Sequence, residues 1–182
     1  MTASGRVIVE SSAIASYLLS TYDVAKKFQG DGGDGDTGDK NDWIRDESLT
    51  SFAGASLGPI ILLKLFLGIA ELQTPALLRP LVRLVTRGVD RAFPGPELKQ
   101  MLTYLEGELA GQAYFMGATP GRADFMLSFP LDMVDAWGWA DWHEYEGLRA
   151  WRERCQGREA WKRALEKGNG YSLAFGEDRE KG

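Results

Sequence analysis

The chain has 182 residues, of which 44% are hydrophobic, 26% charged and 11% aromatic, a composition typical of a globular protein and not of a disordered chain. Its formal net charge of −5 argues against a protein that coats nucleic acid, because such proteins usually carry an excess of positive charge. A single cysteine, Cys155, excludes a disulfide within the chain, and a single histidine, His143, argues against a zinc site or a histidine-based catalytic triad. We therefore expect no metal, and we expect neither residue to act in catalysis.

No targeting segment or membrane span is predicted. The first residues lead into only three apolar positions, 7–9, which are too few for a secretory signal. The longest apolar stretch, residues 57–70, has 14 residues and contains Lys64, whereas a membrane span needs about 20. This stretch favours a buried core helix over a membrane-associated one, and the chain is expected to be cytoplasmic.

The first part of the chain predicts one short strand and one helix. Residues 6–9 are β-rich, and the apolar positions Ile14, Tyr17 and Leu18 then recur at helical spacing. Ser11 or Ser12 is available as the N-cap, and the helix should end near Tyr22. Residues 29–42 are rich in glycine and aspartate, a pattern that indicates a flexible linker.

Helical patterns dominate beyond the linker. We expect five helical stretches. The first covers 43–72, with a bend at Gly58 and Pro59, and the second runs from Thr74 and Pro75 through the apolar positions Leu77, Leu78, Leu81, Leu84 and Val85. After a break at 94–96, the third covers 97–109, the fourth runs from about Gly121 through Phe125, Met126, Phe129 and Val134, and the last covers 146–166 as one helix or a pair. A charged tail follows at 176–182. Since no second strand of any length is predicted, the fold class is all-α.

Four stretches of this sequence resemble the glutathione S-transferase superfamily, and in particular its fungal-type members. They are Val-Glu-Ser-Ser-Ala-Ile at 9–14, Phe-Ala-Gly-Ala-Ser-Leu-Gly-Pro at 52–59, Tyr-Phe-Met-Gly at 114–117 with Arg-Ala-Asp at 122–124, and Arg-Glu-Ala-Trp-Lys-Arg-Ala at 158–164. The third is the most specific. Together the four cover the chain from about residue 6 to residue 168.

The resemblance implies a fold with a thioredoxin-like domain that binds glutathione and a helical domain that shapes the second-substrate pocket. In its light, residues 1–28 look like the last strand and helix of the thioredoxin-like domain, 29–42 is the linker, and 43–175 is the helical domain. The family's first βαβ unit, its cis-proline strand and its sulfur-activating Tyr, Ser or Cys have no counterpart here. No catalytic residue is therefore assigned.

Carried over by position, the resemblance assigns two sets of binding residues. Glu10 and Ser11 would hold the γ-glutamyl end of glutathione, since its ammonium pairs with a carboxylate and its carboxylate with a hydroxyl and free helix N–H groups. The alternative is that Ser11 only caps the helix and Glu10 only complements its dipole. The second-substrate pocket would be formed by Arg45, Ser48, Phe52 and Ser56, with core packing as the alternative for the apolar positions.

The resemblance gives Asp124 a structural role. It occupies the third position of a capping box, whose N-cap would be Gly121, or Thr119 if the helix begins with Pro120. We do not expect it to act in catalysis.

Several functions fit this sequence. The first is a glutathione transferase-like protein that binds a small apolar electrophile, with glutathione as its cofactor. The alternatives are a glutathione-independent isomerase or cyclase of a small-molecule pathway, and a non-catalytic protein-interaction module. A homodimer is expected from the family, and nucleic acid is not an expected partner.

Overall fold

The computed structural model describes residues 5–28, 42–109, 111–168 and 170–173, and every regular element within these ranges is helical. The all-α prediction is therefore confirmed. The predicted tail at 176–182 and, apart from Asp42, the predicted linker lie outside the described residues. The elements are α1 (Ser11–Tyr22), α2 (Asp42–Ser51), the π-helical segment η1 (Phe52–Leu57), α3 (Gly58–Gln73), α4 (Arg79–Ala92), α5 (Pro94–Leu109), α6 (Arg122–Ala136), α7 (Glu146–Gln156) and α8 (Glu159–Lys167).

The predicted strand at residues 6–9 is wrong. These residues lie ahead of α1 without any strand partner among the described residues, and Val7 and Val9 are exposed. A β-rich run needs a neighbouring strand to satisfy its N–H and C=O groups, and the described helices offer none. The helix that follows is confirmed, although it begins at Ser11, and its N-cap Glu10 makes no side-chain capping bond. Neither serine caps it.

α2, η1 and α3 form one continuous helical run, as predicted for residues 43–72. The predicted bend takes the form of a π-helical turn, in which the N–H of Gly58 donates to the carbonyl of Ala53, five residues back. Pro59 has no N–H to offer to the ordinary ladder, so the wider turn forms just ahead of it. Such turns are frequent at functional sites.

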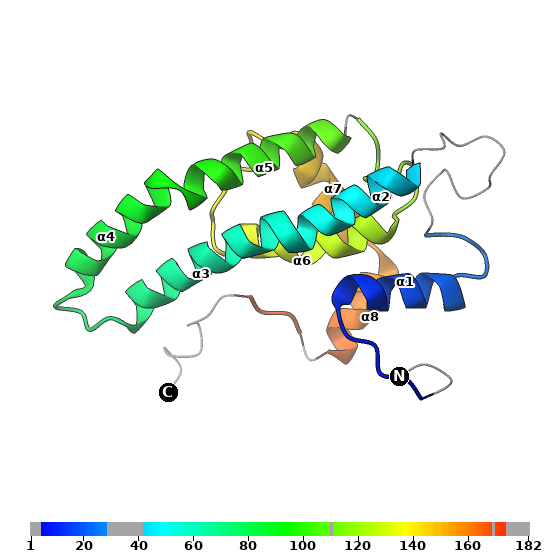
Figure 1. The fold of residues 1–182 in the computed structure, drawn as a ribbon, viewed down its shortest axis with the longest axis horizontal. Coiled ribbons are helices and arrows are strands. Elements are labelled where there is room, and N and C mark those ends of the chain that lie inside the picture. Colours follow the sequence, from blue (N-terminus) through cyan, green and yellow to red (C-terminus); the bar gives the residue numbers. More distant parts are fainter. Residues whose placement is uncertain (1–4, 29–41, 110, 169, 174–182) are drawn as a thin grey trace.

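α3 and α4 lie antiparallel and form an arm that extends past the rest of the molecule (Figure 1). The predicted start of the second helix, at Thr74 and Pro75, is wrong, because α4 begins at Arg79. In a helix that started at Pro75, Pro80 would remove an interior hydrogen bond and clash with the preceding turn. Instead, residues 75–78 form a turn, and Pro80 falls in the first turn of α4, where its missing N–H is harmless.

Two other boundaries refine the predictions. Residues 94–96 were expected to break the chain before a helix at 97, but α5 begins at Pro94 itself. The first four N–H groups of a helix have no partner within it, so two prolines fit in its first turn. The last stretch is a pair of helices, α7 and α8, which is one of the two predicted forms.

The core lies between the α2–α3 run, α5, α6 and α7 (Figure 1). Its fully buried side chains include Leu49, Leu57, Leu98, Leu102, Leu105, Phe115, Leu127, Leu131, Leu148 and Trp151. By length and composition alone the helical run Trp43–Gln73 could cross a membrane. In this fold, however, it supplies Leu49, Leu57 and other residues to the core of the bundle.

α4 contributes little to that core. The apolar positions of its predicted stripe are exposed, with Leu77 at 90%, Leu84 at 71% and Leu81 at 63% of full accessibility. The only buried side chain of α4 is that of Thr86. The arm therefore presents an apolar face that the described part of the chain does not cover.

A buried carboxylate organises the start of α6. Asp124 is 2% exposed, and its oxygens accept hydrogen bonds from the N–H of Gly121 at 2.8 Å, the N–H of Phe115 at 2.9 Å and the indole N–H of Trp151 at 2.7 Å. Burial raises the pKa of this carboxyl group, and the hydrogen bonds act in the opposite direction. Of the two predicted N-caps the structure has Gly121, so only the half of the capping box made by Asp124 is present.

A glycine is required at the N-cap of α6. A Cβ on Gly121 would lie 2.5 Å from Cγ of Met116, which is closer than real contacts allow. This close approach explains why the serine or threonine typical of a capping box is replaced here.

We predict that Asp124→Asn lowers the free energy of unfolding by about 2–4 kcal/mol, because an amide must turn its NH₂ group toward at least one of the N–H donors and leave it unpaired in the core. Urea denaturation would measure the loss. Asp135→Asn is the matched control on the same helix: Asp135 is 44% exposed and pairs with Arg152, so this change should cost less than about 1 kcal/mol. Equal losses for the two variants would contradict the role of Asp124.

Candidate functional site

An apolar groove of about 510 Å³ lies between the N-terminus of α1, the η1–α3 segment and α6. Its walls are Ala53, Gly54, Gly58, Ile61, Leu62, Leu65, Phe125, Met126, Phe129, Pro130 and Met133, and Ser11 is the one residue of α1 that lines it. The groove has the volume usual for a small-molecule site. It can hold an apolar group with a single hydroxyl beside it.

The π-helical turn shapes one wall of this groove. Gly54 lies within the turn and Gly58 directly follows it, and a Cβ on Gly54 would meet no atom within 4 Å. The empty space beside Gly54 is thus open to a ligand. The opposite wall carries Phe125 and Phe129, one helical turn apart on α6 and 42% and 55% exposed.

α1 is held at this groove by one arginine. Arg122, the first residue of α6, donates to the hydroxyl of Ser16 on α1 at 2.9 Å, and it forms ion pairs with Asp46 at 2.8 Å and Glu47 at 2.6 Å on α2. The other oxygen of Asp46 accepts the N–H of Ala123 at 3.0 Å. The guanidinium group thus joins three helices and sets the position of Ser11.

The predicted glutathione-binding pair lies at the start of α1. Both residues are exposed, and Glu10 has φ 74° and ψ 125°, a backbone conformation that is rare outside glycine. Such strain persists only where surrounding structure imposes it, and it often marks a functional position. The Ser11 hydroxyl makes no hydrogen bond with any described residue, and Ser11 lines the groove.

The four residues predicted for the second-substrate pocket lie elsewhere, and none of them lines the groove. Arg45 donates to the carbonyl of Glu108 on α5, with its Nε 3.4 Å from the Glu108 carboxylate, and the ring of Phe52 lies 5.1 Å from that of Tyr104. Ser48 hydrogen-bonds the same tyrosine, whose pKa is raised by burial and by the nearby Glu108. Ser56 is half-buried on the same helical run.

The structure therefore separates the predicted residues into two places. Ser11 is at the groove, whereas Arg45, Ser48 and Phe52 face α5. The neighbouring positions Ala53, Gly54 and Gly58 line the groove in their place. The sequence did offer one indication of the groove, because two glycines four residues apart, Gly54 and Gly58, leave room on one side of a helix.

A family model described as the C-terminal domain of glutathione S-transferase matches residues 94–159. Glutathione S-transferase 1 of Saccharomyces cerevisiae is 22% identical over 176 residues, covering 96% of this chain and 72% of the yeast protein. Glutathione S-transferase 3 of Schizosaccharomyces pombe is 25% identical over 177 residues, covering 97% of this chain and 70% of that protein.

The family model and both yeast relatives support the resemblance of this chain to the glutathione S-transferase superfamily. Solved structures agree in fold: a glutathione S-transferase from Xylella fastidiosa has a TM-score of 0.69 at 19% identity, covering 92% of this chain and 73% of that one. A glutathione transferase from Phanerochaete chrysosporium, URE2P8, has a TM-score of 0.66 at 22% identity, covering 91% and 68%. The resemblance recognised in the sequence motifs is confirmed.

The half-buried thiol of Cys155 is not activated as a nucleophile. Burial raises the pKa of the Cys155 thiol to about 12, and Asp124 acts in the same direction. A thiol with this pKa is almost fully protonated at neutral pH and is a poor nucleophile. In the part of the chain that the structure describes, no three histidine, cysteine or acidic side chains come together in a way that could hold a metal ion.

Proposed function

We propose that this chain is a glutathione transferase-like protein that binds glutathione at the start of α1 and a small apolar electrophile in the adjacent groove. The observation that carries the proposal is the position of Ser11, which begins α1 and also lines the apolar groove. Glutathione held at Ser11 would thus lie next to an electrophile bound in the groove. Two further solved neighbours support the ligand class: a sphingomonad glutathione S-transferase is complexed with glutathione, and Ure2p5 from Phanerochaete chrysosporium is cocrystallised with 1-(S-glutathionyl)-2,4-dinitrobenzene.

The start of α1 has the groups that the γ-glutamyl end of glutathione needs. Glu10 offers a carboxylate to the ammonium group, and the hydroxyl of Ser11 and the uncapped N–H groups of the first turn are suited to the α-carboxylate. The unusual backbone of Glu10 aims these groups away from ordinary helical geometry. The structure favours this interpretation over helix capping by Ser11, since no side chain caps α1.

The groove fits an apolar partner better than a polar one. Among the residues that the structure describes, Ser11 provides the only hydroxyl on its walls and no charged side chain lines it. In the reaction, the sulfur of glutathione would form a bond to an electrophilic carbon while a leaving group such as chloride departs and the thiol proton is released to solvent. No residue of the chain is assigned to activate the thiol of glutathione. Holding the two reactants side by side in a fixed orientation accelerates the reaction by itself.

Ser11→Ala should weaken the binding of reduced glutathione about tenfold, a loss of about 1.4 kcal/mol that matches one hydrogen bond to a charged group. Isothermal titration at millimolar glutathione measures it. Ser20→Ala is the matched control, since Ser20 is an exposed serine on the same helix that bonds only to the carbonyl of Tyr17. An absence of heat with the unmodified protein would refute the glutathione part of the proposal.

Gly54→Leu should lower the rate of conjugation of 1-chloro-2,4-dinitrobenzene with glutathione, because the new side chain would occupy the groove. Gly107→Leu on α5 is its control: a Cβ at either glycine meets no atom within 4 Å, but Gly107 lies outside the groove. The rate is followed by the absorbance of the conjugate. If Gly54→Leu leaves the rate unchanged while glutathione still binds, the groove is not the electrophile site.

The exposed apolar face of α4 supports the homodimer expected for the family. Leu81 and Leu84 lie on this face, opposite the buried Thr86, and a second copy of the chain is the proposed cover. Light scattering should give twice 20.1 kDa for the unmodified protein and the monomer mass for Leu84→Glu. Because Leu84 is 71% exposed, the glutamate does not disturb the fold. A monomeric unmodified protein would rule this interface out.

A further inference from the structure

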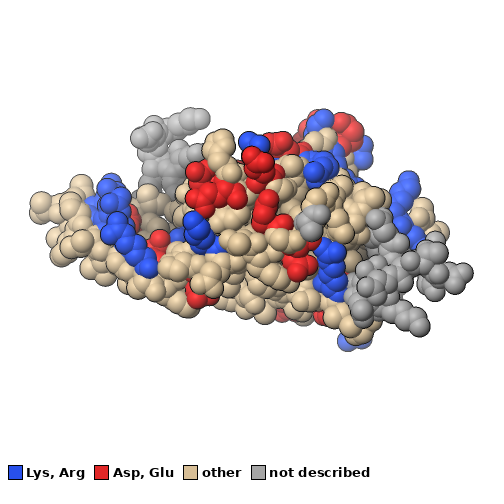
Figure 2. Space-filling model, turned by 90° about the horizontal axis from the view of Figure 1, so that it is seen from above, with Lys and Arg blue, Asp and Glu red and all other residues tan. Residues whose placement is uncertain are grey.

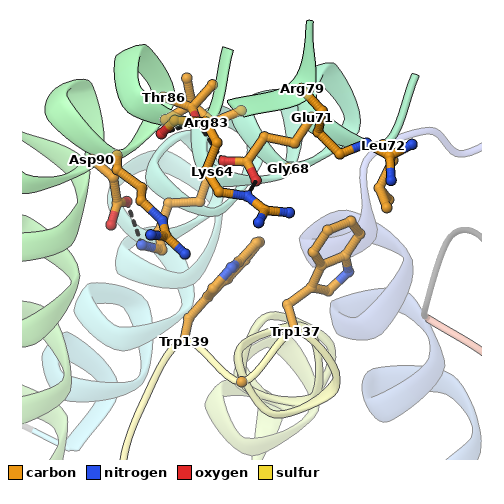
Figure 3. A pocket seen from close by; sticks show the side chains of 13 residues that line it. Lys64, Gly68, Glu71, Leu72, Arg79, Arg83, Thr86, Asp90, Trp137 and Trp139 are labelled. Carbon is orange, nitrogen blue, oxygen red and sulfur yellow. Dashed lines mark hydrogen bonds and ion pairs between the residues drawn. The ribbon is translucent and has the colours of Figure 1, made fainter. Parts of the chain in front are cut away.

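A second cavity, of about 550 Å³, lies between the C-terminal half of α3, α4 and the turn that follows α6 (Figure 3). It shares no lining residue with the apolar groove. In Figure 3 the rings of Trp137 and Trp139 point from one side toward Lys64, Glu71 and Arg83 on the other. The cavity combines aromatic and charged walls, which the groove does not.

Two ion pairs neutralise part of the charge in this cavity. Lys64 is 7% exposed and lies 2.5 Å from a carboxylate oxygen of Asp90, and Arg83 lies 3.2 Å from the carboxylate of Glu71. Glu71 also accepts a hydrogen bond from the hydroxyl of Thr86. Both acidic residues that line the cavity are therefore already engaged with basic ones.

Two further arginines of the cavity form no ion pair with a carboxylate among the described residues. Arg87 lines the cavity, is exposed and makes no hydrogen bond there, although its charge is near enough to Glu71 to help lower the pKa of that carboxyl group. Arg79 lines it too: one of its terminal nitrogens bonds to the carbonyl of Thr74 at 3.3 Å, while its Nε is buried without any hydrogen-bond partner. The two lie on the same side of α4, about 12 Å apart along its axis. Four basic and two acidic side chains line the cavity, so it carries an excess of two positive charges.

These charges are concentrated in an otherwise acidic protein. Arg79, Arg83, Arg87 and Arg91 recur at every fourth position, which places them along one side of α4. Figure 2 shows one group of basic side chains at the end of the molecule that the α3–α4 arm forms, with others elsewhere on this face, and acidic side chains mainly over the middle. The net charge of −5 makes such a local excess stand out.

The tryptophans form a fixed aromatic surface on the other side. The centroids of Trp137 and Trp139 are 5.5 Å apart and their planes are inclined by 31°. Trp137 donates from its indole N–H to the carbonyl of Leu173 at 3.0 Å, and it packs so closely on Gly68 that a Cβ there would lie 2.6 Å from its ring. These contacts hold the ring in place before any ligand arrives.

We propose that this cavity binds an aromatic carboxylate, with the anionic group at Arg87 and Arg79 and the ring against Trp137 and Trp139. A guanidinium group matches a carboxylate with two parallel hydrogen bonds, and an indole offers a flat apolar surface to an aromatic ring. A volume of about 550 Å³ suits a ligand of one or two fused rings. The site is separate from the proposed glutathione and electrophile sites and does not depend on them.

The probe is 2-naphthoate, with the neutral 2-naphthamide as its isostere, and binding is measured by titration calorimetry and by quenching of tryptophan fluorescence. The unmodified protein should bind the carboxylate at least tenfold more tightly than the amide. Arg87→Gln should reduce the affinity for the carboxylate about tenfold, and Arg87→Lys, which keeps the charge but not the two-pronged geometry, should reduce it less. Arg87 makes no contact that the fold needs, so both variants should stay folded.

Arg91→Gln provides the matched control, because Arg91 lies one turn further along the same side of α4 but does not line the cavity. It should leave 2-naphthoate binding unchanged. The proposal is overturned if Arg87→Gln binds as the unmodified protein does, if Arg91→Gln weakens binding equally, or if the amide binds as well as the carboxylate. It is also overturned if Gly54→Leu, and not Arg87→Gln, removes binding, since the probe then occupies the groove.

Discussion

The buried carboxylate of Asp124 is the contact on which the rest of the structure depends. It joins the start of α6 to the loop at Phe115 and to α7 through Trp151, and all three partners donate N–H groups to it. Burying a carboxylate is costly, and the cost is offset here because its oxygens accept hydrogen bonds in fixed directions. Moving any one of the three elements would leave a polar group unpaired in the core. α6, which passes through the centre of the bundle, is therefore fixed in both position and direction.

The candidate site depends on the same helix start. Two residues before Asp124, Arg122 reaches outward to Asp46 and Glu47 on α2 and to Ser16 on α1. The first turn of α6 thus points one side chain into the core and another across the surface. Because α1 contributes no buried residue, polar contacts such as this one carry much of its attachment. The distance between Ser11 and the walls of the groove is then set by α6, and the fold and the site share one anchor.

The sequence predicted the parts that depend on local chemistry. Helical spacing located α1, α5, α6 and the long α2–α3 run, and the motif around Asp124 identified the capping contact. The sequence could not predict which neighbour each side of a helix would contact. The apolar spacing around Phe52 is the same whether its ring faces α5 or a ligand. The wider π-helical turn adds to the difficulty, since it changes the angle between successive side chains. The groove residue Gly54 is therefore adjacent in sequence to positions that point elsewhere.

α4 shows the same limit more strongly. Its leucines recur as a core stripe would, yet the core is already filled by α2–α3, α5, α6 and α7, and α4 is held against α3 by polar contacts, among them the Lys64–Asp90 pair and the bond from Thr86 to Glu71. An arm attached in this way leaves its apolar side in water and its cavity with more basic than acidic side chains. Neither feature stabilises the isolated chain, since exposed leucines gain no burial and uncompensated charges repel each other. Folding alone does not account for these two surfaces, whereas binding accounts for both: a second copy of the chain on the apolar side, and an anionic ligand between the arginines and the tryptophans.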